Sequence, residues 1–265
     1  MKTVSVNTHR ASILGARINA LSWNEALGTL SAWGSNRESR YICICNVHSV
    51  VTAKQDPRFQ SVINHADMAT PDGMPLAWTL RRLGFPGQQR INGPDLMWKY
   101  CERAAANGQS IFLYGSTDAT LDLLQNRLKS AFPALKIAGA YSPPFRPLST
   151  EEEQSIVAMI NDSGANVVFV GLGCPKQEFW MAEHRGRIKA VMIGVGAAFD
   201  YHAGTIKRAP LWMQNSGFEW LYRLVSEPRR LWRRYLVTNS LFVLFICRQF
   251  WQRRLNATES VRRKG

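Results

Sequence analysis

The chain has 265 residues, of which 46% are hydrophobic, so it can bury a sizeable core in one large domain or in a domain with an appendage. Its five cysteines are odd in number and lie partly in apolar runs, which excludes a disulfide framework and fits a reducing cytoplasm. The formal net charge is +14, and residues 221–265 hold 11 basic and two acidic residues, so the basicity belongs mainly to the tail.

Neither a signal peptide nor a membrane-spanning helix is expected. Residues 1–20 are of mixed polarity and contain no apolar core typical of a signal peptide. The longest apolar run, Leu241 to Cys247, is far short of the ~20 residues that span a bilayer.

Short apolar runs alternate with helical patterns along the first 200 residues. Residues 41–45 are apolar without interruption, which is typical of a strand buried in a parallel sheet. The predicted strands are residues 12–15, 41–45, 110–114, 136–139, 166–170 and 190–196. The predicted helices are residues 24–33, 50–65 with a break at Asp56-Pro57, 118–132, 177–187 and one that opens at 149–153. This alternation predicts an α/β fold, a mainly parallel sheet with helices on both faces.

Ligands of open α/β sheets bind beyond the carboxyl ends of the strands. Here those ends are residues 46–48, 115–117, 171–173 and 194–196. Glycines there, including Gly115, Gly173 and Gly196, let a ligand approach the backbone. Because free N–H groups at the following helix starts suit diphosphate oxygens, we expect a nucleotide or another phosphorylated ligand.

Three polar side chains follow these strand ends. Lys176 can face a phosphate, Gln177 can bond a sugar hydroxyl or a base edge, and Asp200 can accept hydrogen bonds from a ribose or base. The alternatives are a solvated helix start for the first two and an N-cap for Asp200. His48 is more typical of a structural histidine, and the other histidines make no metal-ligand spacing.

Asp72 is the candidate general base. It stands between Pro71, whose ring fixes φ, and Gly73, which permits positive φ, so the acid lies on a defined turn. A rigid loop that presents an acid suits a general base. The alternative is an Asp that only stabilises its own turn.

Gly171-x-Gly173 and Gly194-x-Gly196 also suggest a dinucleotide site. Lys176 and Phe199 stand where the third glycine of that motif belongs, and a Walker A loop is absent. An NAD(P)-dependent oxidoreductase therefore stays as an alternative function, beside a non-enzymatic membrane or RNA adaptor.

The tail combines arginines with aromatic and aliphatic residues. The spacing of Arg229, Arg230, Arg233 and Arg234 predicts that they share one helix face. Such a helix can lie on an anionic membrane surface, and the same arginines, with Arg223, can neutralise a diphosphate. Nucleic acid is not expected, because its binding would leave the apolar stretch after residue 240 exposed.

Taken together, the motifs resemble the WecG/TagA/CpsF family of bacterial glycosyltransferases. The matching stretches are residues 46–50, 66–67, 71–75, 90 with 93–96, 171–178, 194–200 and 207–230. They occur in order and span the chain from about residue 12 to about residue 236.

The resemblance implies a Rossmann-like catalytic domain, residues 1–207, and a C-terminal helical, basic and membrane-associating appendage, residues 208–265. It implies transfer of a sugar from a UDP-sugar to a polyprenyl-diphosphate-linked saccharide, with inversion at the anomeric carbon. Asp72 falls at the position of the family's proposed base. The expected substrate-binding residues are Asn46, Arg90, Asp95, Gly115, Gly173, Lys176, Gln177, Gly196 and Asp200.

The resemblance places the protein at the cytoplasmic face of the bacterial inner membrane, in surface-polysaccharide synthesis. Because the chain has no Asp-x-Asp pair, we expect neither a metal nor another cofactor. Many family members carry Thr where this chain has Ile44, so N-acetylmannosamine, N-acetylmannosaminuronate and glucose all stay open as the donor sugar. A homo-oligomer also stays open.

Overall fold

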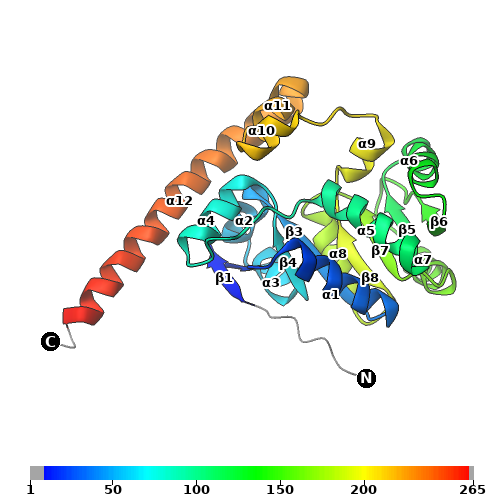
Figure 1. The fold of residues 1–265 in the computed structure, drawn as a ribbon, viewed down its shortest axis with the longest axis horizontal. Helices are drawn as coiled ribbons and strands as arrows, with labels where there is room; N and C mark the ends of the chain where they lie inside the picture. Colours follow the sequence, from blue (N-terminus) through cyan, green and yellow to red (C-terminus); the bar gives the residue numbers. More distant parts are fainter. Residues whose placement is uncertain (1–8, 263–265) are drawn as a thin grey trace.

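A six-stranded parallel sheet forms the centre of the protein (Figure 1). The computed structural model describes residues 9–262, with side chains through residue 256. The strand order is β4-β3-β8-β7-β5-β6. The strands are β3 (Arg40–Cys45), β4 (Met68–Pro71), β5 (Ser110–Gly115), β6 (Lys136–Tyr141), β7 (Val167–Gly171) and β8 (Val191–Gly194).

Helices cover both faces of the sheet, because the continuous apolar strands bury side chains on either side. One face packs against α2 (Val47–Gln55), α3 (Pro57–His65), α7 (Thr150–Asp162) and α8 (Lys176–His184). The other packs against α1 (Trp23–Ser35), α5 (Gly93–Asn107), α6 (Asp118–Ala131) and α9 (Ala198–Ala203). The predicted fold class is confirmed.

One expectation for the N-terminal half is wrong in part, and one strand there was not predicted. Residues 12–15 do not form a strand of the main sheet; they contain the turn of a separate antiparallel hairpin, β1 (Arg10–Ile13) and β2 (Ala16–Asn19). The strand β4 was not expected, because it is only four residues long and ends in proline. It pairs with β3 at the edge of the sheet and is followed by α4 (Met74–Arg82).

Three helices form the C-terminal part: α10 (Leu211–Asn215), α11 (Glu219–Ser226) and the long α12 (Pro228–Arg262). The predicted boundary at residue 207 lies in the connection before α10. Figure 1 shows α12 running along one side of the body, past α4 and α2. Phe242 is buried in the core there, and the side chain of Gln249 bonds to Leu14 N and Ser12 O, each at 2.8 Å.

A membrane-spanning helix is not found between residues 9 and 262: none of the helices there combines the length and the hydropathy that a crossing requires.

Candidate functional site

A cavity of about 1360 Å³ opens at the carboxyl ends of the sheet strands. The segments after β3, β4, β7 and β8 line one side of it, and α11 and α12 line another. Pockets for one small ligand usually measure ~300–1,000 Å³, so this cavity has room for two substrates. The predicted residues that line it are Asn46, Asp72, Arg90, Gly173, Gln177, Gly196, Asp200, Arg223, Arg230 and Arg234.

Backbone geometry holds Asp72 at the cavity wall. Its amide donates to the carbonyl oxygen of Cys45 at 2.7 Å, which ties the end of β4 to the end of β3. Gly73 follows with φ of 84° and begins the turn into α4. In the described part of the chain, no side chain hydrogen-bonds to the Asp72 carboxylate, which leaves its oxygens available to a ligand.

Burial raises the pKa of Asp72 to about 7, and the negative charge of Glu219 acts in the same direction. Arg90, Arg208 and Arg223 oppose the shift. A carboxyl group with a pKa near neutrality can exchange a proton with a substrate hydroxyl at physiological pH.

Gln177 lies at the polar end of the cavity and is only 4% exposed. Its Oε1 accepts the amide of Gly173 at 3.2 Å, and its Nε2 donates to Oε1 of Glu178 at 3.0 Å. A Cβ on Gly194 would lie 2.9 Å from that Nε2, so glycine makes room for the side chain. The remaining N–H and lone pair of Gln177 are thus held in a fixed direction.

Glu178, next to Gln177, is a buried acid that the sequence analysis did not predict as a site residue. It is 2% exposed, burial raises its pKa to about 7, and its Oε2 has no hydrogen-bond partner among the described residues. Nothing in its spacing distinguishes it from a solvated Glu in a first helical turn. Its contact with Gln177 makes it a positioning group for that amide.

Asp200 lines the cavity at the start of α9. Burial raises its pKa, and the nearby positive charges of Arg230 and Arg223 oppose that shift. The guanidinium of Arg223 also lies over the ring of Tyr201, 5.7 Å from its centroid. An acid and two cations from different elements therefore meet here.

Only part of the predicted arginine set faces the cavity. Arg230 and Arg234 line it, whereas Arg229 and Arg233 do not, and of the four only Arg234 is partly buried. The prediction of one shared face is therefore wrong: residues four apart align, but neighbours differ by ~100° around a helix. The Nε atoms of Arg223 and Arg234 are buried without hydrogen-bond partners in the described region, so both can receive an anion.

An ion-pair network fixes the C-terminal helices beside Asp72. Arg90 donates to Glu219 and to Gln214, each at 2.7 Å. Arg208 binds Asp95, and its Nε lies 3.7 Å from Glu219. Glu219 thus joins Arg90, which follows α4, to Arg208, which precedes α10.

Three predicted substrate-binding residues lie outside the cavity lining. Asp95 is engaged by Arg208. Gly115 is needed for close strand packing, since a Cβ there would lie 2.7 Å from the backbone of Gly171. Lys176 is exposed at the start of α8.

His48 lines the cavity, although its sequence position suggested only a structural role. Burial lowers its pKa to about 4, helped by the charge of Arg234, so the ring is neutral at pH 7. Its Nδ1 has no partner among the described residues, which leaves it able to bond a ligand.

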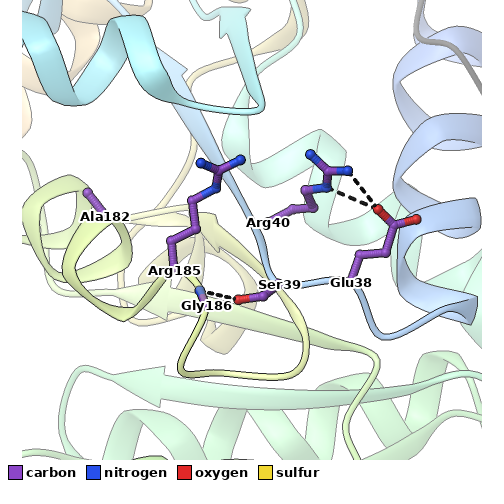
Figure 2. A pocket seen from close by; sticks show the side chains of 6 residues that line it. All are labelled: Glu38, Ser39, Arg40, Ala182, Arg185 and Gly186. Carbon is purple, nitrogen blue, oxygen red and sulfur yellow. Dashed lines mark hydrogen bonds and ion pairs between the residues drawn. The ribbon is translucent and has the colours of Figure 1, made fainter.

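A second hollow, of about 670 Å³, lies near the amino-terminal ends of β3 and β4 (Figure 2). Arg40 and Arg185 project into it, and each lies 2.8 Å from Asp67, while Arg40 also pairs with Glu38 at 2.9 Å. Its cations are therefore already neutralised, and we assign it a structural role. Across residues 9–262, His, Cys, Asp and Glu side chains form no cluster of three that could hold a metal ion.

Comparison with known proteins identifies the group to which the chain is related. The sequence profile described as "Glycosyl transferase WecG/TagA/CpsF family" matches residues 11–256. The chain is 34% identical over 197 residues to N-acetylglucosaminyldiphosphoundecaprenol N-acetyl-beta-D-mannosaminyltransferase of Bacillus spizizenii, and this match covers 74% of each chain. The profile includes both sides of the cavity, from β3 to α12. The chain therefore belongs to the WecG/TagA/CpsF family of glycosyltransferases, as its motifs predicted.

Proposed function

We propose that the protein is an inverting glycosyltransferase that moves a sugar from a UDP-sugar to a polyprenyl-diphosphate-linked saccharide during surface-polysaccharide synthesis. The observation that carries the proposal is Asp72, an accessible carboxyl group with a pKa of about 7, in one cavity with Gln177 and unpartnered arginine nitrogens. The relative's name describes a lipid-linked acceptor of this kind. Family membership favours this function over the oxidoreductase and the adaptor.

The proposed reaction is a direct displacement. The Asp72 carboxylate takes the proton of an acceptor hydroxyl while that oxygen attacks the anomeric carbon of the donor. The bond from that carbon to the UDP oxygen breaks, and its electron pair leaves with UDP. Attack opposite the leaving group inverts the anomeric configuration.

Arginine side chains stabilise the leaving diphosphate in this proposal. Arg223, Arg230 and Arg234 line the cavity from α11 and α12, and guanidinium groups bind phosphate oxygens with two parallel hydrogen bonds. Gln177 and Asp200 bind the nucleotide or its sugar at the strand ends, where Asn46, Gly173 and Gly196 form the nearby wall.

The assignment of arginines to the leaving diphosphate leads to a prediction about metal dependence. Because arginines provide the positive charge, we expect turnover to change less than twofold after extensive treatment with EDTA. The measurement is the initial rate before and after chelation, with a Mn²⁺-dependent glycosyltransferase as the assay control. Loss of activity that Mn²⁺ restores would contradict the arginine assignment.

The outward surface of the C-terminal helices suits a membrane. The exposed residues of these helices include Trp212, Trp232 and Trp251 as well as Arg229 and Arg233. Apolar side chains enter the lipid interface while arginines attract anionic head groups. We therefore propose peripheral attachment at the cytoplasmic face of the inner membrane.

The donor sugar is to be identified by experiment. N-acetylmannosamine is favoured by the relative's name, while Ile44, which lines the cavity, lacks the hydroxyl that many family members place there. A panel of UDP-N-acetylmannosamine, UDP-N-acetylmannosaminuronate and UDP-glucose, tested with a synthetic polyprenyl-diphosphate-linked sugar, measures transfer directly. Transfer from one of them supports the proposal, whereas no binding of UDP or of any of these donors would overturn it.

The raised pKa of Asp72 predicts a pH dependence. A base works when deprotonated, so kcat/KM should rise about tenfold per pH unit below about 7 and level off above it. Glu178 has a similar pKa, so the control is Glu178→Gln. In this variant kcat/KM should still rise with pH below about 7. An apparent pKa near 4 in the kcat/KM profile would show that Asp72 is not the titrating base. Loss of the pH-dependent rise in Glu178→Gln would show the same.

A further inference from the structure

One part of the cavity is not used by the chemistry above: its apolar extension along the second half of the α12 lining. Residues from successive turns of this helix line the cavity from Arg230 to Phe250, a distance of about 30 Å at ~1.5 Å per residue. The first part of this lining is cationic and polar, with Arg230, Arg234 and Asn239. The second part is apolar.

We define the apolar track as Phe242, Val243, Ile246 and Phe250 of α12 together with Met74 and Trp78 of α4. Val243 is 59% exposed and Trp78 is 45% exposed, so the track is open to a ligand. Asp72 lies between β4 and α4, and it lines the same cavity. A ligand in the track is therefore continuous with the proposed reaction centre.

We propose that the apolar track binds the hydrocarbon chain of the lipid-linked acceptor, an inference that rests on the proposed function. The change from cationic to apolar lining along α12 matches a molecule that has a diphosphate head and an isoprenoid tail. The acceptor sugar then lies at Asp72, its diphosphate lies near Asn239 where the polar lining ends, and the first isoprene units follow the track towards Phe250. A soluble sugar acceptor has no hydrocarbon chain that could contact this apolar surface.

The track is distinct from the outward surface proposed to contact the membrane, and α12 contains a matched pair that separates the two. Val243 and Leu244 are neighbours with similar exposure, 59% and 62%. Val243 lines the cavity and Leu244 does not. Polar substitution of either one leaves the buried core intact.

The test uses prenyl diphosphates of five, ten and fifteen carbons, titrated into the full-length protein by calorimetry at one fixed detergent concentration and saturating UDP. All three have the same head group. We expect affinity to increase about tenfold with each isoprene unit, since burial of roughly two methylene groups corresponds to that factor. Val243→Gln and Phe250→Gln should weaken binding of the fifteen-carbon compound at least about fivefold and leave the five-carbon compound unchanged, whereas Leu244→Gln should match the wild type.

Equal affinity for all three chain lengths would show binding through the head group alone and would overturn the inference. Equal losses in Val243→Gln and Leu244→Gln would also overturn it. A parallel titration with UDP alone tests the proposed function separately. If UDP binds but affinity for the prenyl diphosphates does not depend on chain length, only the inference about the track is overturned. If UDP does not bind, the proposed function is overturned.

Discussion

The Asp72→Asn variant should lose about 10²–10⁴-fold in kcat, the range that a positioned general base supplies. Asparagine keeps the size of the side chain but cannot accept the acceptor's proton. Because Gln177 and the cavity arginines are unchanged, UDP should bind with its normal affinity. The measurements are single-turnover rates with the identified donor and calorimetric titration with UDP.

The control is Asp122→Asn, which removes an exposed carboxylate on α6 outside the cavity lining. It should leave both the rate and UDP affinity unchanged. An Asp72→Asn enzyme with a rate within about threefold of the wild type would exclude Asp72 as the base. A loss of UDP binding equal to the loss of rate would indicate a binding role instead.

The double variant Arg230→Gln/Arg234→Gln should lose at least about 10² in kcat while Arg229→Gln/Arg233→Gln keeps its turnover in detergent. Both variants remove two positive charges from the same helix, but only the first pair lines the cavity. Removing one preorganised donor to developing negative charge typically costs ~10²–10³-fold. The comparison therefore separates local stabilisation of the leaving diphosphate from a general loss of charge.

Binding to vesicles should depend more on Arg229 and Arg233, the pair outside the cavity lining, than on Arg230 and Arg234. Each arginine near an anionic surface contributes about 1 kcal/mol, so Arg229→Gln/Arg233→Gln should bind anionic vesicles about 30-fold more weakly. Sedimentation with vesicles that contain 30% anionic lipid, roughly a biological content, measures this. If the two double variants lost turnover equally, the separate roles proposed for the cavity-lining arginines and for Arg229 and Arg233 would be contradicted.

The sheet could be predicted because its strands are continuous apolar runs, as in residues 41–45 and 167–170. Burial on both faces requires that pattern, and helical periodicity between the runs implies parallel order. The turn at Asp72 was also predictable, since Pro71 and Gly73 restrict the backbone locally. β4 escaped prediction because four residues ending in proline give no pattern until β3 is beside them.

The arrangement of the site depends on contacts that sequence spacing does not show. Asp95 and Arg208 are over 100 residues apart, and their ion pair explains why the acid is not in the cavity lining. Glu178 adjoins Gln177 in the sequence, but its burial depends on how α8 packs against the sheet. The division between Arg229 and Arg230 depends on how α12 is rotated about its axis, which Phe242 fixes by packing into the core.

The anomeric configuration of the product tests the proposed mechanism, a single direct displacement at the anomeric carbon, most directly. The product formed from an α-linked UDP-sugar is isolated from the wild-type enzyme, and the one-bond C1–H1 coupling is measured by NMR before any non-enzymatic change occurs. A β-linked product is the result that direct attack by an acceptor oxygen, with Asp72 taking its proton, requires. An α-linked product would show retention and would contradict the single-displacement mechanism.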